Sequence, residues 1–194
     1  MKTKLFVAAL AATALVPAAA QAQRVPAAAV AVVDTDQISQ TCTACRAASA
    51  TLQSQEATLR TRAQTLQQQI QSTGSTLQTQ VQALNGKEPD AALKAKINAF
   101  EAQQRAAQNE LGSGQQRLQS TQANVNQQIS AKLQTIVASV SAARGANVTI
   151  AKGDVMYAAS TIDITAEVLA QLNQQLPAVS VTPLPQTQQP QQSR

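Results

Sequence analysis

Apolar residues recur along the middle of the chain at alternating steps of three and four. They follow this spacing from Leu52 to Leu84 and again from Leu93 to Val140, with mostly Gln, Ser and Thr between them. The pattern predicts two long helices, each with one apolar stripe, that pack as in a coiled coil. The predicted seam contains Leu59, Leu66, Ile70, Leu77, Leu84, Leu93, Ile97, Phe100, Leu111 and Leu118.

A turn separates the two striped segments at residues 85–90, where Gly86 and Pro89 stand close together. Glycine adopts a left-handed conformation at little cost, and proline cannot continue a helical hydrogen-bond ladder. We therefore expect one unbroken helix over residues 36–83 and a return helix beyond the turn. Together they form a long antiparallel helical hairpin, an arm over residues 49–144 with its tip near residues 85–90.

Short strands are expected on both sides of the arm. Residues 27–33 form an apolar, Val-rich run, and residues 147–151 and 154–158 read as two strands joined by a hairpin turn at Lys152-Gly153. Both ends of the arm must therefore meet at one small sheet. A sheet of this size leaves its edges uncovered, and association with further copies of the chain would cover them.

The remaining segments complete a small body, formed by residues 23–48 and 145–176. Gly145 fits a helix C-cap, and Thr165 is expected to cap a final helix that Pro177 ends. Residues 177–194 are rich in Pro and Gln and are expected to be a disordered tail. The fold class is thus mainly α, with a small β body from which a helical arm projects.

The first 22 residues have the pattern of a signal peptide. Two lysines precede an apolar run, and Ala20-Gln21-Ala22 predicts cleavage between Ala22 and Gln23. No later segment approaches the roughly 20 consecutive apolar residues that span a bilayer, so we expect an exported protein that is not integral to the membrane.

Composition limits the partners of the chain. Without Lys2 and Lys4 the net charge is 13 − 10 = +3, and the basic residues are spread out, which argues against nucleic acid but is compatible with transient contact with a membrane surface. Aromatic residues are only 2% of the chain, so it can fill narrow seams between helices but not a wide core. The Gln-rich outer faces are interpreted as solvated.

The sequence offers little chemistry. It contains no His, the usual general base and the commonest metal ligand, and its ten carboxylates are scattered. No glycine-rich phosphate loop is present. We therefore predict no catalytic, metal-binding or cofactor-binding residues, and a protein that is not an enzyme.

Cys42-Thr43-Ala44-Cys45 is the one motif with chemical content. In an exported protein, two cysteines favour an internal disulfide first, bridges between neighbouring protomers second and catalytic thiol exchange third. Their place near the root of the arm suggests that a bond there stiffens the junction with the body.

The chain resembles the Skp/OmpH family of periplasmic chaperones. The resemblance is carried by residues 30–35 in the first strand, by residues 148–151 and 155–158, and by residues 162–168 with Leu172-Asn173. It implies a periplasmic homotrimer, with a β-barrel-like body and helical arms around a cavity. It also implies that unfolded outer-membrane proteins are held there without ATP. A structural or adaptor coiled coil of the cell envelope is the alternative, and a redox protein is the third class.

Overall fold

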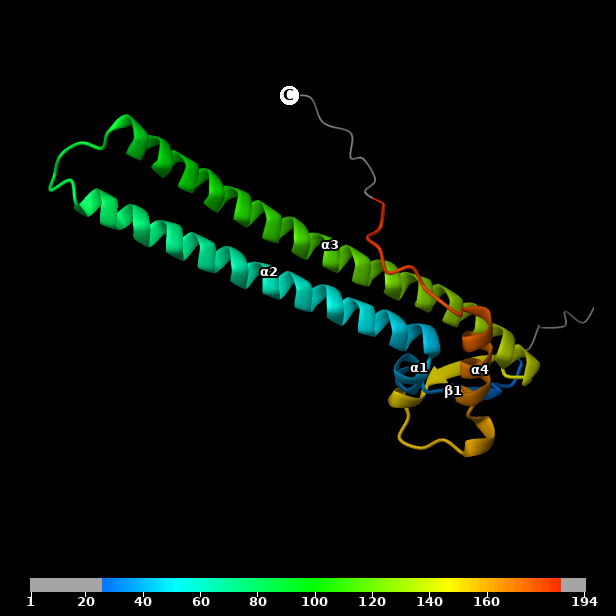
Figure 1. The fold of residues 1–194 in the computed structure, drawn as a ribbon. Helices are drawn as coiled ribbons and strands as arrows, with labels where there is room; N and C mark the ends of the chain where they lie inside the picture. Colours follow the sequence, from blue (N-terminus) through cyan, green and yellow to red (C-terminus); the bar gives the residue numbers. More distant parts are fainter. Residues whose placement is uncertain (1–25, 186–194) are drawn as a thin grey trace, which may run out of the picture.

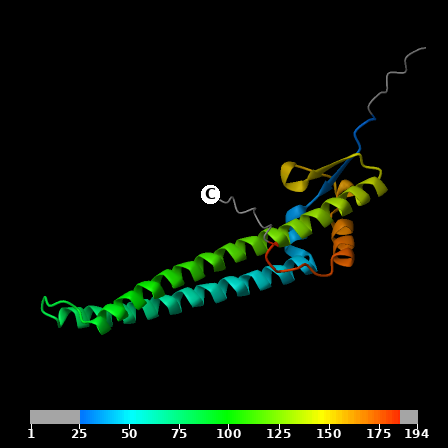
Figure 2. The same cartoon turned by 90° about the horizontal axis from the view of Figure 1, so that it is seen from above.

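The computed structural model describes residues 26–185; the expected signal peptide, with its cleavage site between Ala22 and Gln23, lies outside the described residues. A long two-helix arm projects from a small body that holds both of its ends (Figures 1 and 2). The elements are strand β1 (Val30–Val33), helices α1 (Thr35–Thr41), α2 (Thr43–Gln82) and α3 (Ala91–Ala143), strand β2 (Val148–Ala151), the 3-10 turns η1 (Lys152–Asp154) and η2 (Ser160–Ile162), and helix α4 (Thr165–Gln175).

The arm consists of α2 and α3, with 40 and 53 residues. At 1.5 Å per residue they are about 60 and 80 Å long. They run side by side in opposite directions: Arg62 pairs with Glu110, and nearer the tip a Cβ placed on Gly74 would lie 3.2 Å from the ring of Phe100. The turn between them uses the left-handed conformation at Asn85 and at Gly86, where φ is 85°.

The helix expected over residues 36–83 is broken at Cys42, so the prediction of an unbroken helix is wrong. The backbone of Cys42 is extended, with φ −61° and ψ 135°, and it separates α1 from α2. The freed N–H of Thr43 donates to Oδ1 of Asn173 on α4, at 2.9 Å. Because the body supplies this acceptor, the chain can change direction without leaving a backbone donor unpaired.

The sheet of the body has two strands rather than three. β1 and β2 pair in parallel, from Val30 opposite Val148 to Val33 opposite Ala151, and Asp163 forms an isolated bridge to Val32. The predicted strand at residues 154–158 does not form. A two-residue hairpin turn needs positive φ, which Gly153 lacks, so the chain closes a 3-10 turn instead and does not reverse along β2.

The core of the body lies where α1, α3 and α4 meet beside β1. Its largest side chains, Ile38, Ile136, Ile164 and Leu172, are at most 1% exposed. α3 ends here as expected at Gly145, whose φ is 73°, with the paired hydrogen bonds of a Schellman motif: Gly145 N–H to Ala142 and Ala146 N–H to Ser141.

An ordered segment follows α4. Residues 177–185 run back along the arm without helix or strand and bend at Thr182 (Figure 1), so the prediction of disorder from Pro177 onward is wrong as far as residue 185. Val179 packs against the core of the body, and the following backbone is hydrogen-bonded to side chains of the arm. Residues 186–194 lie outside the described part of the chain.

Candidate functional site

Asp163 connects the turn η1 to the start of α4 in the body. Its Oδ2 accepts a hydrogen bond from Nζ of Lys152 at 2.9 Å, and its Oδ1 accepts one from the N–H of Thr165 at 2.9 Å, at the start of α4. Thr165, which we expected to cap α4, instead accepts the N–H of Asp34 with its hydroxyl oxygen at 2.8 Å. Asp163, which precedes the N-cap residue Ile164, therefore pairs with the first N–H of α4, while Thr165 secures the end of β1.

These contacts stabilise the ionised form of Asp163. Hydrogen bonds from the Thr165 side chain and from Lys152 lower the pKa of Asp163 from 3.8 to about 2, and the hydrogen bond to Asp163 raises the pKa of Lys152. Asp34 lies further away, with its carboxylate 3.9 Å from the same ammonium group. A carboxylate that is ionised at neutral pH and already paired is a structural group rather than a proton donor or acceptor.

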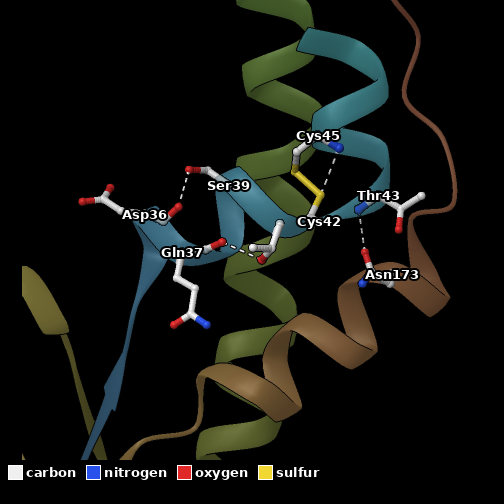
Figure 3. Close-up of a disulfide and its surroundings, with 8 residues drawn as sticks. Asp36, Gln37, Ser39, Cys42, Thr43, Cys45 and Asn173 are labelled. Carbon is white, nitrogen blue, oxygen red and sulfur yellow. Dashed lines mark hydrogen bonds between the residues drawn. A yellow bond between two sulfur atoms is a disulfide. The ribbon is translucent and has the colours of Figure 1, made fainter. Parts of the chain in front are cut away.

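Cys42 and Cys45 lie at the junction of α1 and α2 and form an intramolecular disulfide (Figure 3). Cys42 is fully buried and Cys45 is 7% exposed. Cys42 is also the N-cap of α2, since its sulfur accepts the N–H of Cys45 at 3.0 Å. The internal disulfide, ranked first among the three alternatives, is therefore the one that this structure contains, at a buried junction.

The predicted seam residues line the contact between α2 and α3. Leu59 and Phe100 pack over Gly114 and Gly74 of the partner helix, positions that have no side chain. The other eight are buried (Leu66, Leu77, Leu93) or half-buried (Ile70, Leu84, Ile97, Leu111, Leu118).

A cavity of about 410 Å³ opens between the arm helices toward the body. Leu59 and Leu118 give it apolar walls, and Pro183 of the C-terminal segment lies at its edge. Arg62 donates two hydrogen bonds to Glu110 in the wall, at 2.6 and 3.0 Å, and this pairing lowers the pKa of Glu110 and raises that of Arg62. The cavity combines apolar surface with hydrogen-bonding groups, as a site for peptide requires.

Side-chain amides and one hydroxyl group on the arm hydrogen-bond to the backbone of the C-terminal segment. The sequence predicted only solvation for these Gln and Asn residues, because an amide that binds backbone leaves no periodic apolar signal. The contacts are Gln128 Oε1 and Nε2 with Ser180 N–H (2.9 Å) and C=O (3.0 Å), Gln55 Nε2 with Val181 C=O (3.3 Å), Asn124 Nδ2 with Thr182 C=O (2.9 Å), and Ser120 Oγ with Leu184 N–H (3.0 Å).

Large apolar side chains are exposed on the body, away from the arm. Met156 and Tyr157, in the segment that forms no strand, are 107% and 86% exposed, and Val148 on β2 is 41% exposed. Monomeric proteins seldom expose neighbouring large side chains in this way.

The part of the chain that the structure describes contains no group of three or more side chains arranged to hold a metal ion. Over the same residues, no helix has the length and apolar character needed to cross a membrane.

Comparison with known proteins agrees with this architecture. Residues 29–172 match the family model described as outer membrane protein (OmpH-like). The fold is similar to the crystal structure of an OmpH-like protein from Caulobacter crescentus CB15, a candidate outer membrane chaperone. The TM-score is 0.66 with 20% identity, over 87% of this chain and 98% of that one. None of the curated proteins with which the sequence was compared matches it.

Proposed function

Because this chain belongs to the family of OmpH-like outer membrane proteins, we propose that it is a periplasmic holding chaperone for unfolded outer-membrane proteins. The observation that carries the proposal is the arm, which projects from the body. Along both of its helices, exposed polar residues lie beside half-buried apolar ones. Most of its length is not needed to build the core of the body. Such a surface is suited to contact with another polypeptide.

The chemistry of the clients explains why holding them is useful. Outer-membrane β-barrel strands alternate apolar and polar residues, and before insertion their unpaired edges aggregate in water. An arm with few charges and many amide groups can make numerous weak contacts to such a chain. Weak contacts permit release without ATP.

A homotrimer is the second part of the proposal. Residues 155–158 have a strand-forming composition but no strand partner within the described part of the chain, and Met156 and Tyr157 are exposed there. Association with copies of the chain would cover this surface. Replacing both residues by Ser should lower the native mass to that of a monomer, whereas Val81→Ser, at an exposed position near the tip, should leave a trimer. A monomeric parent protein would refute this part.

Light scattering of an unfolded outer-membrane β-barrel, diluted from urea, tests the holding activity. We expect the protein without residues 1–22 to suppress aggregation and to co-elute with the client. If it does neither, the chaperone proposal is wrong, and a structural or adaptor coiled coil becomes the better interpretation.

A further inference from the structure

The C-terminal segment occupies a groove on the arm that recognises polypeptide backbone. From its contacts we infer that this groove is a binding site for one extended segment of an unfolded outer-membrane client, and that residues 180–184 occupy it in competition with the client. The inference rests on the proposed holding function and assigns a site to it. Five hydrogen bonds to the backbone of residues 180–184, and none to their side chains, make recognition largely independent of sequence.

The spacing of the binding groups fits an extended chain. Along α3, Gln128, Asn124 and Ser120 lie four residues apart and contact Ser180, Thr182 and Leu184, which lie two residues apart. Four helical residues rise about 6.0 Å, and two extended residues about 6.6 Å, so the two repeats nearly coincide. Because the chain bends at Thr182, each two-residue step matches one four-residue step of the helix separately, and residues 180–184 are not one straight strand.

The bound segment also has the residue pattern of the proposed client. Val179 and Val181 are half-buried against the arm and body, while Ser180 and Thr182, which follow them in turn, are exposed; the alternation ends at Thr182. Alternation of apolar and polar residues is the signature of an outer-membrane β-strand. The chain's own segment thus presents to the groove the chemistry that an unfolded β-barrel strand would present.

The groove extends past the bound segment. Beyond Pro183 it continues as the cavity between Leu59 and Leu118, which the described residues of the tail leave open. A client segment that enters this cavity as well would gain contacts that residues 180–185 do not make, which gives it a means of displacing them.

Peptide binding tests the inference directly. The probe is a fluorescein-labelled peptide with the sequence of residues 178–186, Ala-Val-Ser-Val-Thr-Pro-Leu-Pro-Gln, and the readout is anisotropy. Protein ending at Val179, which keeps its packing on the core, should bind the probe roughly tenfold or more tightly than the full chain, because a tethered competitor acts at high local concentration. Equal binding by the two proteins would overturn the inference.

A full-length variant checks that the truncation itself is not responsible. Val181→Asp places a charge on a half-buried side chain of the segment and should open the groove, whereas Thr182→Asp, at the neighbouring exposed position, should not. If both substitutions change probe binding equally, the tail is not held as the structure shows.

Two matched substitutions on α3 locate the site. In the protein ending at Val179, Gln128→Ala removes both hydrogen bonds to the backbone of the probe residue that corresponds to Ser180. It should weaken probe binding about tenfold. Gln127→Ala, an exposed amide one position away, should have no effect. Equal effects would place the site elsewhere.

Competition with client-like peptides identifies the occupant. A peptide that alternates Val and Thr between terminal lysines should displace the probe, and a peptide of the same composition with its Val residues consecutive should do so less well. Equal displacement would refute the preference for alternating segments.

Client holding is measured in parallel, so that the two proposals fail separately. We expect the truncated protein to suppress aggregation at lower concentration than the full chain. If both hold the client equally and neither binds the probe, the groove assignment is wrong and the holding function stands. If the probe binds but no variant holds the client, the holding function is wrong, and the groove is then a docking site for the tail alone.

Discussion

Acid should selectively weaken the body through Asp163. Its carboxylate accepts hydrogen bonds from Lys152 and from Thr165, and its side chain is 22% exposed. The shift of its pKa from 3.8 to about 2 corresponds to about 2.5 kcal/mol of folding stability at about 1.4 kcal/mol per pH unit. Because Lys152 is half exposed and screened by solvent, we expect about 1–2 kcal/mol.

The sign follows from the direction of the shift. The folded protein binds the proton more weakly than the unfolded chain, so the contribution is fully present above about pH 4. It is lost as the pH falls from about 4 to about 2, since the unfolded chain then takes up a proton that the folded state binds only at lower pH.

Urea unfolding followed by far-ultraviolet circular dichroism, at fixed protein concentration from pH 7 to pH 2, measures this contribution. Asp163→Asn keeps an oxygen that can accept the N–H of Thr165 but loses the charge. It should be about 1–2 kcal/mol less stable than the parent at pH 7 and nearly equal to it at pH 2. Asp154→Asn, at an exposed position in the adjoining turn, should differ little at any pH. A deficit of Asp163→Asn that is unchanged between pH 7 and pH 2 would refute the reasoning.

Three further substitutions test the arm and its junctions. Gly112→Ala should raise the unfolding free energy by about 0.5–1 kcal/mol, because nothing lies within 4 Å of its added Cβ. Gly114→Ala should raise the unfolding free energy less, because its Cβ would lie 2.6 Å from Leu59. Thermal melts that rank the two variants in reverse would contradict this. Gly145→Ala should cost about 1 kcal/mol in urea unfolding because φ is 73° there, and a neutral effect would contradict the C-cap assignment. Replacing Cys42 and Cys45 together by Ser should lower stability by about 2 kcal/mol at most but leave client holding mostly intact; complete loss of holding would favour the redox class.

The arm could be predicted from sequence because its signals are local. Gly86 and Pro89 break the helix by their own backbone properties, and a repeat of three and four residues marks a helix face whatever surrounds it. Gly145 belongs to the same class, because a C-cap depends on a few neighbouring residues. The break at Cys42 was missed because the group that satisfies its backbone, the amide of Asn173, is far away in sequence.

The parts that sequence could not predict depend on distant partners. Residues 155–158 have the same apolar character as a strand, but no sequence pattern states which edge is available to them. The C-terminal segment has the Pro and Gln content of a disordered tail, yet Gln128 and Asn124 on α3 satisfy its backbone. Glutamine serves equally as a solvated residue and as a backbone ligand, so composition cannot separate the two roles.

The topology of the sheet explains how so small a body can hold so long an arm. β1 and β2 are parallel, and the whole arm is the crossover between them, so Ala29 and Asn147 meet across 118 residues of chain. Closing an open loop of that length would be entropically costly and slow. An arm that pairs from the Gly86 turn downward shortens the loop step by step, and the strands then meet at its root. We therefore expect the helical seam to help assemble the body as well as to extend from it, and a weakened seam to destabilise both.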